Sequence, residues 1–425
     1  MRVFVGPLEV AGIGAGFVEG LRANGASADL VCAYAHRFAY SAQAVPARIV
    51  RWWAHWGTRR AALPASRPVA KGFAFGLQQL IGWAVLAWAV RRYDAFVFLY
   101  GETITNTGLE LNLLRWLGKR TVVVFVGSDA RPPYIDGGWF PADRPFDLDA
   151  VRLAAARQQR KVTRLERQAS LCVNALATAH FHRRRFVDWF ALGIPRAAQA
   201  AAPAPNGTTL RALHSPSHPV LKGTARIRAV VEALRAKGVA IELVTIEGRP
   251  NAEVMQALRD CDLAIDQLYS DTPMAAFATE AASVGRAVLI GGYNAGRVAA
   301  DASGLPMPPT RFVHPDSLET ALEALAADRA ERERLGAQAH AFVAGHWSPA
   351  AVGARLLCLL RDDIPPVWWR EPAQVTHLHG CGLAEDAARD RVRSLIDRFG
   401  AGALQLDDKP ALREAFIAFA KGAAA

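Results

Sequence analysis

Residues 210–248 read LRALHSPSHPVLKGTARIRAVVEALRAKGVAIELVTIEG, and this stretch decides the fold class. An apolar run at 210–214 is followed by a polar loop, a helical segment at 225–237 and a second apolar run at 240–246. Short apolar runs bounded by polar loops indicate buried strands, and the longer periodic segment indicates a helix. A strand, a helix and a strand in this order predict an open parallel sheet.

The same alternation continues on both sides of this stretch. Downstream, the sequence predicts helices at 252–260 and 275–284 and strands at 263–267 and 287–290. Upstream, it predicts strands at 2–5, 29–32, 94–100 and 120–126, a glycine-rich turn at 12–16, and helices at 17–23, 109–117 and 149–169. The runs DAFVFLY and RTVVVFV are apolar throughout, which is typical of parallel strands buried on both faces.

An Ala- and Pro-rich segment at 197–208 interrupts the alternation and is the best linker candidate in the chain. We therefore expect an α/β protein with two Rossmann-like, doubly wound domains, at 1–196 and 209–349. A mostly helical C-terminal extension follows at 350–425.

Composition narrows the function classes. The 425 residues are 52% hydrophobic and 21% charged, which excludes a disordered or collagenous chain. The formal net charge of +11 indicates an anionic partner, namely nucleic acid, a phosphorylated substrate or an acidic membrane surface. Nucleic acid is the weakest of these because no known nucleic-acid-binding motif accompanies the basic run at 183–185, so we expect no nucleic-acid partner.

The cysteines and the N-terminus bear on location. Five widely spaced cysteines do not suggest a disulfide framework and fit a reducing compartment. The first residues, MRVFVGPLEV, lack the features of a signal peptide, so we expect a cytoplasmic protein. His377, His379 and Cys381 are soft metal ligands at alternate positions, but no second cluster completes a tetrahedral site, and we expect no metal.

The segment 73–90 reads FAFGLQQLIGWAVLAWAV and carries no charge. Three interpretations are open: a buried helix of the α/β domain, a contact with the membrane interface, or a spanning helix of minimal length. The preceding residues 48–60, RIVRWWAHWGTRR, combine Trp and Arg in a way that suits a membrane interface. Association with the inner face of the membrane is therefore a second expectation for location.

Ligands of open α/β sheets bind in loops at the carboxyl ends of the strands. In the loop after 210–214, Lys222 precedes a helix whose first N–H groups favour a phosphate, and Gly223 and Thr224 follow it. Glu280 lies in a helical segment of small residues, where a carboxylate needs a partner or a ligand.

Two N-terminal loops also carry candidate residues. Gly12, Gly14 and Gly16 give an incomplete dinucleotide fingerprint that still lets a backbone approach an anion. Ser128, Asp129 and Arg131 follow a predicted strand, where a carboxylate and a guanidinium are placed for substrate contact. The alternative for Asp129 is a helix cap.

The segments HSPSHPVLKGT, DCDLAIDQL and FATEAASVGRAVLIGGY resemble the donor-nucleotide domain of GT-B glycosyltransferases, in particular the family-4-like retaining group (glycosyl transferases group 1 type). In the N-terminal half, YDAFVFLYGETI and GKRTVVVFVGSDAR are similar in a looser way, so the resemblance spans about 1–349. It implies a nucleotide-sugar donor on the C-terminal domain, an acceptor on the N-terminal domain, and transfer that is retaining and metal-independent, with no cofactor.

Carried over by position, the resemblance implies that Lys222 neutralises the departing diphosphate and that Glu280 binds the ribose hydroxyls. Glu280 matches the second Glu of the family's E-x7-E motif, and Thr272 stands where the first Glu is expected. We expect Lys222 and Asp129 in catalytic positions. The full expected donor site is Gly14, His214, Ser215, Lys222, Gly223, Thr224, Glu247, Thr272 and Glu280. The expected acceptor site is Gly12, Ser128, Asp129 and Arg131.

The expected partners are a UDP- or GDP-sugar and a glycan or lipid-linked acceptor, with a peripheral contact to an anionic membrane. Polysaccharide biosynthesis is the broad role that these partners suggest. Because Thr272 replaces the first Glu, a catalytically inactive nucleotide- or membrane-binding protein of the same fold remains an alternative, as does a nucleotide-sugar epimerase.

Overall fold

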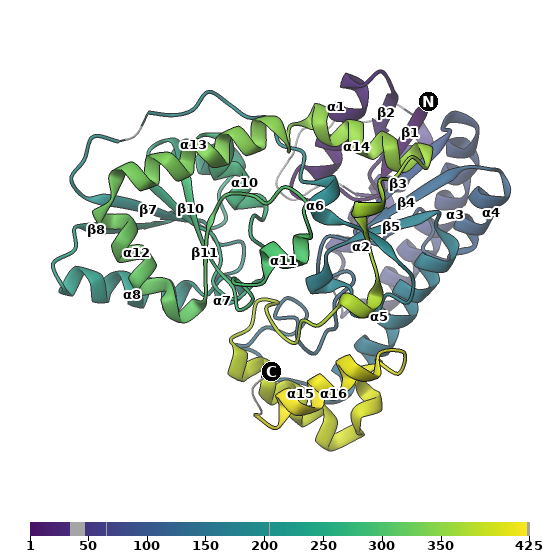
Figure 1. The fold of residues 1–425 in the computed structure, drawn as a ribbon. Helices are drawn as coiled ribbons and strands as arrows, with labels where there is room; N and C mark the ends of the chain where they lie inside the picture. The colour runs from purple at the N-terminus through teal and green to yellow at the C-terminus, as the bar shows by residue number, and fades with distance from the viewer. Residues whose placement is uncertain (35–46, 65, 204, 423–425) are drawn as a thin grey trace.

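The computed structural model describes residues 1–34, 47–64, 66–203 and 205–422. Residue 204 of the predicted linker and residues 423–425 of the predicted extension lie outside this range. The described chain forms two α/β domains side by side, with the C-terminal helices below the N-terminal domain (Figure 1).

The N-terminal domain contains a seven-stranded sheet that is parallel except at one edge. Its strands lie in the order β12 (Trp369–Arg370), β6 (Phe186–Asp188), β5 (Leu171–Asn174), β4 (Arg120–Val124), β3 (Ala95–Leu99), β1 (Arg2–Gly6) and β2 (Ser27–Leu30). The strand order reverses between β1 and β3, which gives this domain a topological switch point.

Helices cover both faces of this sheet. One face packs against α2 (Arg48–Ala62), α3 (Pro68–Arg92), α4 (Leu109–Trp116), α5 (Leu148–Gln168), α15 (Glu385–Phe399) and α16 (Pro410–Ala420). The other face packs against α1 (Ile13–Ala23), α6 (Trp189–Leu192) and α14 (Pro349–Arg361). Every residue of β3 is buried, as its uninterrupted apolar sequence predicts.

The C-terminal domain has a five-stranded sheet that is parallel throughout. Its order is β11 (Arg311–Val313), β10 (Ala287–Gly291), β9 (Leu263–Ile265), β7 (Leu210–His214) and β8 (Ile241–Thr245). One face packs on α9 (Asn251–Arg259), α10 (Ala276–Ser283) and α13 (Arg329–Gly345), and the other on α8 (Thr224–Ala236) and α12 (Leu318–Ala327). The short helices α7 (Pro219–Lys222) and α11 (Val298–Ala302) lie in loops, and the strand order reverses between β7 and β9.

Two sequence predictions need correction. The glycine-rich segment 12–16 is not a free turn, because α1 already begins at Ile13 after a left-handed Gly12. The interpretation of 73–90 as a buried helix holds only for part of α3: Val85 and Leu86 join the core, whereas Phe73 and Leu80 are 67% and 70% exposed. The packing of neighbouring helices, which the local sequence does not encode, decides which turns are covered.

The predicted C-terminal extension is helical, and it packs on the N-terminal domain. After α13 the chain returns across α1 as α14, adds β12 antiparallel to β6, and ends in α15 and α16, which lie by α5 in the core of the first domain. Between these elements, Gly382 N donates to Tyr269 O at 2.8 Å and Gly137 N donates to Cys381 O at 3.1 Å. Residues 369–382 therefore form a strap that contacts both domains.

The crossing of α1 and α14 depends on two glycines. A Cβ on Gly20 would lie 1.9 Å from the Pro349 carbonyl oxygen, and one on Gly353 would lie 2.1 Å from the Gly20 backbone. Either substitution must push the helices apart.

We predict that Gly353→Ala lowers the free energy of unfolding by about 1–3 kcal/mol through overpacking. Gly72→Ala in α3 is the matched control, because nothing lies within 4 Å of a Cβ there, and it should raise stability by about 1 kcal/mol. Urea denaturation followed by circular dichroism measures both changes. Equal effects of the two substitutions would contradict this account of the crossing.

Candidate functional site

The carboxyl ends of both sheets face a shared cleft with a volume of about 290 Å³. Loops that follow β1, β4, β5 and β6 line it from the N-terminal domain, and loops that follow β9 and β10 line it from the C-terminal domain. A cleft at the carboxyl ends of parallel strands is where open α/β sheets bind ligands.

Lys222 lies at the switch point between β7 and β9 and is not itself among the residues that line the cleft. Its Nζ donates to Asp266 Oδ1 at 2.7 Å and to Gln267 Oε1 at 2.9 Å, and Gln267 lines the cleft. Asp266 is 1% exposed and its Oδ2 has no partner among the described residues. A cation paired with a buried carboxylate is thus held one hydrogen bond away from a residue that lines the cleft.

Gly223 allows the close turn that presents Lys222. It has a φ of +71°, and a Cβ there would lie 2.8 Å from the Leu268 Cβ. Only glycine adopts this conformation in this space without strain.

His214, Ser215 and Thr224 use their polar atoms within the domain. His214 Nδ1 lies 2.8 Å from Ile265 O, and its Nε2 lies 2.8 Å from Thr224 Oγ1. Ser215 Oγ donates to Ile246 O at 3.0 Å, and burial lowers the pKa of His214. In this structure they shape the loop that carries Lys222, and their direct contact with a donor stays a prediction.

Glu280 is buried near the cleft and holds two partners that the sequence did not suggest. Its Oε1 accepts from Arg196 Nη2 at 2.9 Å and from Asn251 Nδ2 at 2.8 Å. Burial raises the pKa of Glu280, Arg196 opposes this rise, and the charge of Asp266 adds to it. Lys222, Asp266, Glu280 and Arg196 therefore form one electrostatic cluster.

Two other predicted donor residues differ in position. Thr272 lines the cleft, and its carbonyl oxygen accepts from Gln267 Nε2 at 3.3 Å. Glu247 is exposed and is not among the lining residues. The structure thus brings Thr272, but not Glu247, to the cleft.

In the first loop, an internal carboxylate occupies the start of α1. Glu9 accepts from Gly14 N at 3.2 Å and from Ala15 N at 2.8 Å, and it is buried. Gly12 lies between the cleft-lining residues Ala11 and Ile13. The first N–H groups of a helix favour an anion, and here the Glu9 carboxylate already occupies that position.

In the second loop, Ser128 and Asp129 have structural partners and Arg131 reaches the cleft. Asp129 is buried and accepts from Gly127 N at 2.8 Å and Val126 N at 3.0 Å, and burial raises the pKa of its carboxyl to about 6. Ser128 Oγ lies 2.6 Å from Tyr100 Oη. Arg131 lines the cleft and pairs with Asp136.

Sequence reasoning missed a group of charged residues at the far side of the cleft. Arg370 of the strap pairs with Asp188 at 2.7 Å, and both side chains are almost fully buried. His377 lies 3.4 Å from Asp301, and both line the cleft together with Asp188. The sequence did not indicate that these residues lie together, because they are up to 189 positions apart and share no motif.

No group of three or more His, Cys, Asp or Glu residues in the described part of the chain is arranged to hold a metal ion. The cysteines are free. That the reaction needs no metal or cofactor stays a prediction.

Comparison with known proteins identifies the fold. The chain matches no protein-family model and no curated protein. Among solved structures, OtsA in its apo form matches with a TM-score of 0.51 and 12% identity over 86% of this chain and 99% of that one. HepE of Anabaena, solved with UDP and glucose, gives a TM-score of 0.48 and 11% identity over 85% and 99%. The glycotransferase of kitacinnamycin gives 0.44 and 16% over 84% and 97%.

The OtsA match, together with the two facing parallel sheets, defines the chain as a protein of the GT-B fold. The identity is low, so this match establishes the architecture alone. The expected fold class is confirmed.

We predict that Asp129 makes stability depend on pH. Burial raises the pKa of its carboxyl to about 6, so the folded protein favours the protonated form. The resulting stability is fully present at pH values well below 4 and is lost as the pH rises through 6. Asp129→Asn lacks this titration. From pH 7 to pH 4, the free energy of unfolding of the wild type should therefore gain about 2 kcal/mol relative to the variant.

Urea denaturation at a series of pH values measures this difference. The exposed Asp143→Asn is the matched control and should track the wild type at every pH. A difference between wild type and Asp129→Asn that stays constant with pH would contradict the role of Asp129 burial.

Proposed function

We propose that this protein is a glycosyltransferase that moves a sugar from a nucleoside diphosphate donor to an acceptor bound in the cleft. The observation that carries the proposal is the position of Lys222, which is hydrogen-bonded to the cleft-lining Gln267 and lies at the switch point of the C-terminal sheet. The sequence resemblance assigns the donor diphosphate to this loop.

The proposed role of Lys222 is to stabilise the negative charge of the leaving diphosphate. When the bond between the sugar and the diphosphate breaks, negative charge grows on the leaving oxygen, and a fixed cation lowers the energy of that state. Lys222 is held by Asp266 and Gln267 before any ligand arrives, so little rearrangement is needed. Arg196 is the second cation of the cluster.

Glu280 suits the role of a ribose contact. Both of its hydrogen bonds to described residues go to Oε1, and a carboxylate offers lone pairs on both oxygens. Oε2 is therefore the atom we assign to a ribose hydroxyl.

The finer parts of the proposal rest on the resemblance to the family-4-like group. They are a UDP- or GDP-sugar as donor, retention at the anomeric carbon, independence of metal, a glycan or lipid-linked acceptor, and a cytoplasmic location with a role in polysaccharide biosynthesis. A thermal-shift screen against nucleotide-sugars tests the donor, since ligand at a hundred times its dissociation constant stabilises by about 2.7 kcal/mol. NMR of the product tests the anomeric outcome.

A second candidate is a donor-binding protein without transfer activity. Thr272 motivates it, because this cleft residue stands where the resemblance expects a sugar-binding Glu. Binding of a nucleotide-sugar without hydrolysis or transfer would favour this candidate over the enzyme.

We predict that removing the Lys222 charge slows the reaction. Lys222→Ala alone would leave Asp266 charged and unpaired in the interior, so the better variant is Lys222→Met with Asp266→Asn. Transfer should slow by about 10²–10³-fold with the fold retained.

The matched control is Lys237→Met with Glu319→Gln, which removes an exposed ion pair of 2.6 Å from the same domain and should leave the rate unchanged. Rates are measured with the donor found in the screen, and circular dichroism checks the fold. An unchanged rate in the Lys222 variant would refute the assignment of this residue.

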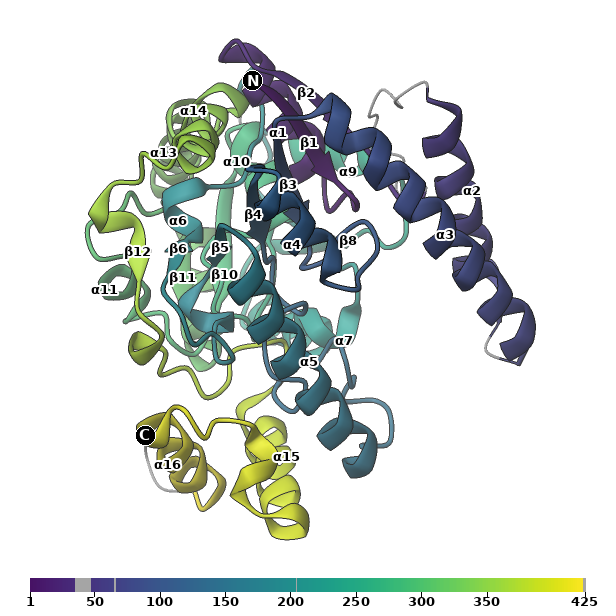
Figure 2. The same cartoon turned by 90° about the vertical axis from the view of Figure 1, so that its right-hand side faces the viewer.

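We further propose that α2 and α3 dock on an anionic membrane. The two helices form a hairpin that projects from the N-terminal domain (Figure 2). α3 is the one helix of the described residues that is long and apolar enough to cross a membrane, and only 33% of its most apolar window is buried. Trp52 is 67% exposed, and residues 48–92 contain eight Lys or Arg and no Asp or Glu. Exposed apolar side chains with flanking cations are typical of interfacial helices.

We predict that Phe73→Ser with Leu80→Ser weakens binding to phosphatidylcholine vesicles by at least about tenfold, because each side chain loses its apolar transfer energy. The control, Val367→Ser, changes an exposed apolar residue that lies outside the hairpin and outside α2 to α5, and it should bind as the wild type does. Vesicle sedimentation measures both proteins. Equal binding of the double variant and the control would contradict docking through the hairpin.

A further inference from the structure

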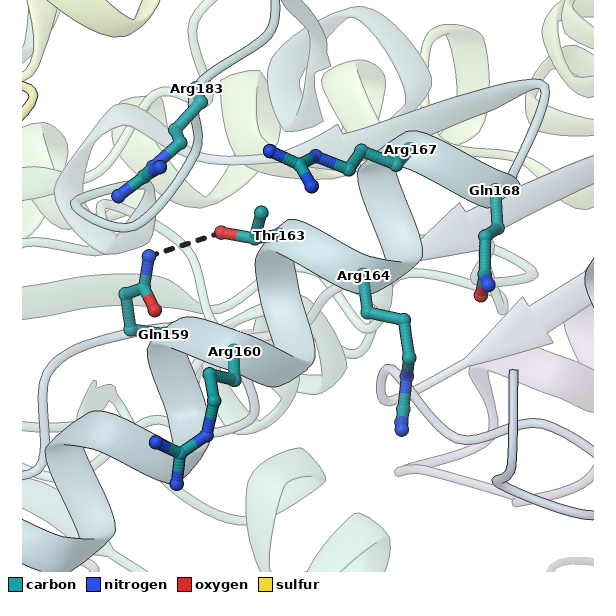
Figure 3. A pocket seen from close by; sticks show the side chains of 7 residues that line it. All are labelled: Gln159, Arg160, Thr163, Arg164, Arg167, Gln168 and Arg183. Carbon is teal, nitrogen blue, oxygen red and sulfur yellow. Dashed lines mark hydrogen bonds between the residues drawn. The ribbon is translucent and has the colours of Figure 1, made fainter. Parts of the chain in front are cut away.

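A groove rich in arginine is lined by residues of α5 and by Arg183 (Figure 3), and it shares no lining residue with the cleft. It has a volume of about 480 Å³, and four guanidinium groups line it, those of Arg160, Arg164, Arg167 and Arg183. Gln159 and Thr163 complete the same side and are joined by a hydrogen bond of 3.2 Å. No acidic side chain is among the lining residues.

Most of these arginines lack an internal counterion. Within the described residues, Arg160, Arg164 and Arg167 form no ion pair, and Arg183 is 3.7 Å from Asp408. The Nε of Arg164 is buried without a hydrogen-bond partner. A planar guanidinium has donors that fit a phosphate oxygen pair, so the groove offers several free donors to anionic groups.

Exposed apolar side chains border the groove. Arg164 and Gln168 pack close to Gly108, and the next residue, Leu109, is 61% exposed at the start of α4. At the other end of α4, Trp116 is 81% exposed, and Arg115 Nη1 donates to Arg167 O at 3.2 Å. A basic groove beside apolar residues has the two halves of a phospholipid contact, a phosphate site and an apolar edge.

The groove and the α2–α3 hairpin share one face of the domain, because α2 to α5 all pack on the same side of the N-terminal sheet. Residues 148–168 hold six basic and two acidic residues, and residues 48–92 hold eight and none. Together these segments carry a net charge of +12, whereas the whole chain carries +11. The rest of the protein is thus nearly neutral, and the excess charge is concentrated in helices of this face.

We propose that the arginine groove binds the phosphate of an anionic phospholipid headgroup while the α2–α3 hairpin is docked on the membrane. The inference rests on the proposed docking and adds a specific headgroup site to it. The hairpin supplies apolar contact and a general attraction to anionic lipid, and the groove adds a specific site for the headgroup phosphate. Through the two contacts, the face made by α2 to α5 is held against the bilayer.

The test compares two double variants that remove equal charge. Arg160→Gln with Arg167→Gln changes two exposed groove residues, and Arg228→Gln with Arg235→Gln changes two exposed residues of α8. Each protein is sedimented with vesicles of phosphatidylcholine and with vesicles that also contain phosphatidylglycerol. Near a surface each basic residue contributes about 1 kcal/mol, so the groove variant should lose about thirtyfold in affinity for the anionic vesicles. Its affinity for phosphatidylcholine, and the α8 variant's affinity for both vesicles, should match the wild type.

Four results would overturn the proposal. Equal losses in both variants would indicate general charge attraction. Unchanged vesicle binding in the groove variant, with loss of pyrophosphate binding measured by calorimetry, would indicate a free phosphate compound as the ligand. Wild-type protein that binds phosphatidylcholine but gains nothing from phosphatidylglycerol would refute the headgroup site and the attraction of the hairpin cations, but not the apolar docking. Failure to bind either vesicle would refute the docking as well.

Discussion

The return of the chain to the first domain after α13 is the constraint on which the cleft depends. α14 crosses α1 at a distance that only Gly20 and Gly353 allow, and the strap then joins β6 through β12. The same strap pairs with the 269–271 segment of the second domain, where Asp271 N donates to Gly380 O at 2.9 Å. Because one segment bonds to both domains, it fixes how their two carboxyl edges face each other.

The return of the chain to the first domain also buries charged side chains. Arg370 and Asp188 come from the strap and from β6, and each would be costly to bury without the other. The same holds across the domain boundary, where Arg196 bridges Glu280 of the second domain and, at 3.4 Å, the Ala11 carbonyl of the first. The charged cluster around Lys222 is thus preorganised by contacts from both domains.

The sequence predicts the framework well and the site only in part. Buried parallel strands are encoded locally, so runs such as DAFVFLY and RTVVVFV identify β3 and β4 almost to the residue. Lys222 could be singled out as a candidate because the loop after a strand, Gly223 and the following helix are contiguous, and its role stays a prediction. Arg196, Asp301 and His377 could not, since their proximity arises from the packing of distant segments. The partial burial of α3 could not be predicted for the same reason, because its composition does not show which of its turns pack against the domain.

The distribution of charge also bears on the function. A diphosphate site needs cations, yet Lys222 and Arg196 each pair with a carboxylate, so the cleft itself adds little to the net charge. The excess lies on α2, α3 and α5, where acidic residues are scarce. The distribution of charge therefore supports the proposed membrane contact more than it supports the proposed donor site. A bilayer fits this charge better than nucleic acid does, because exposed Trp, Phe and Leu side chains accompany the cations. Apolar side chains beside cations are typical of a membrane interface. Contacts to a nucleic-acid backbone are instead made by basic and polar groups.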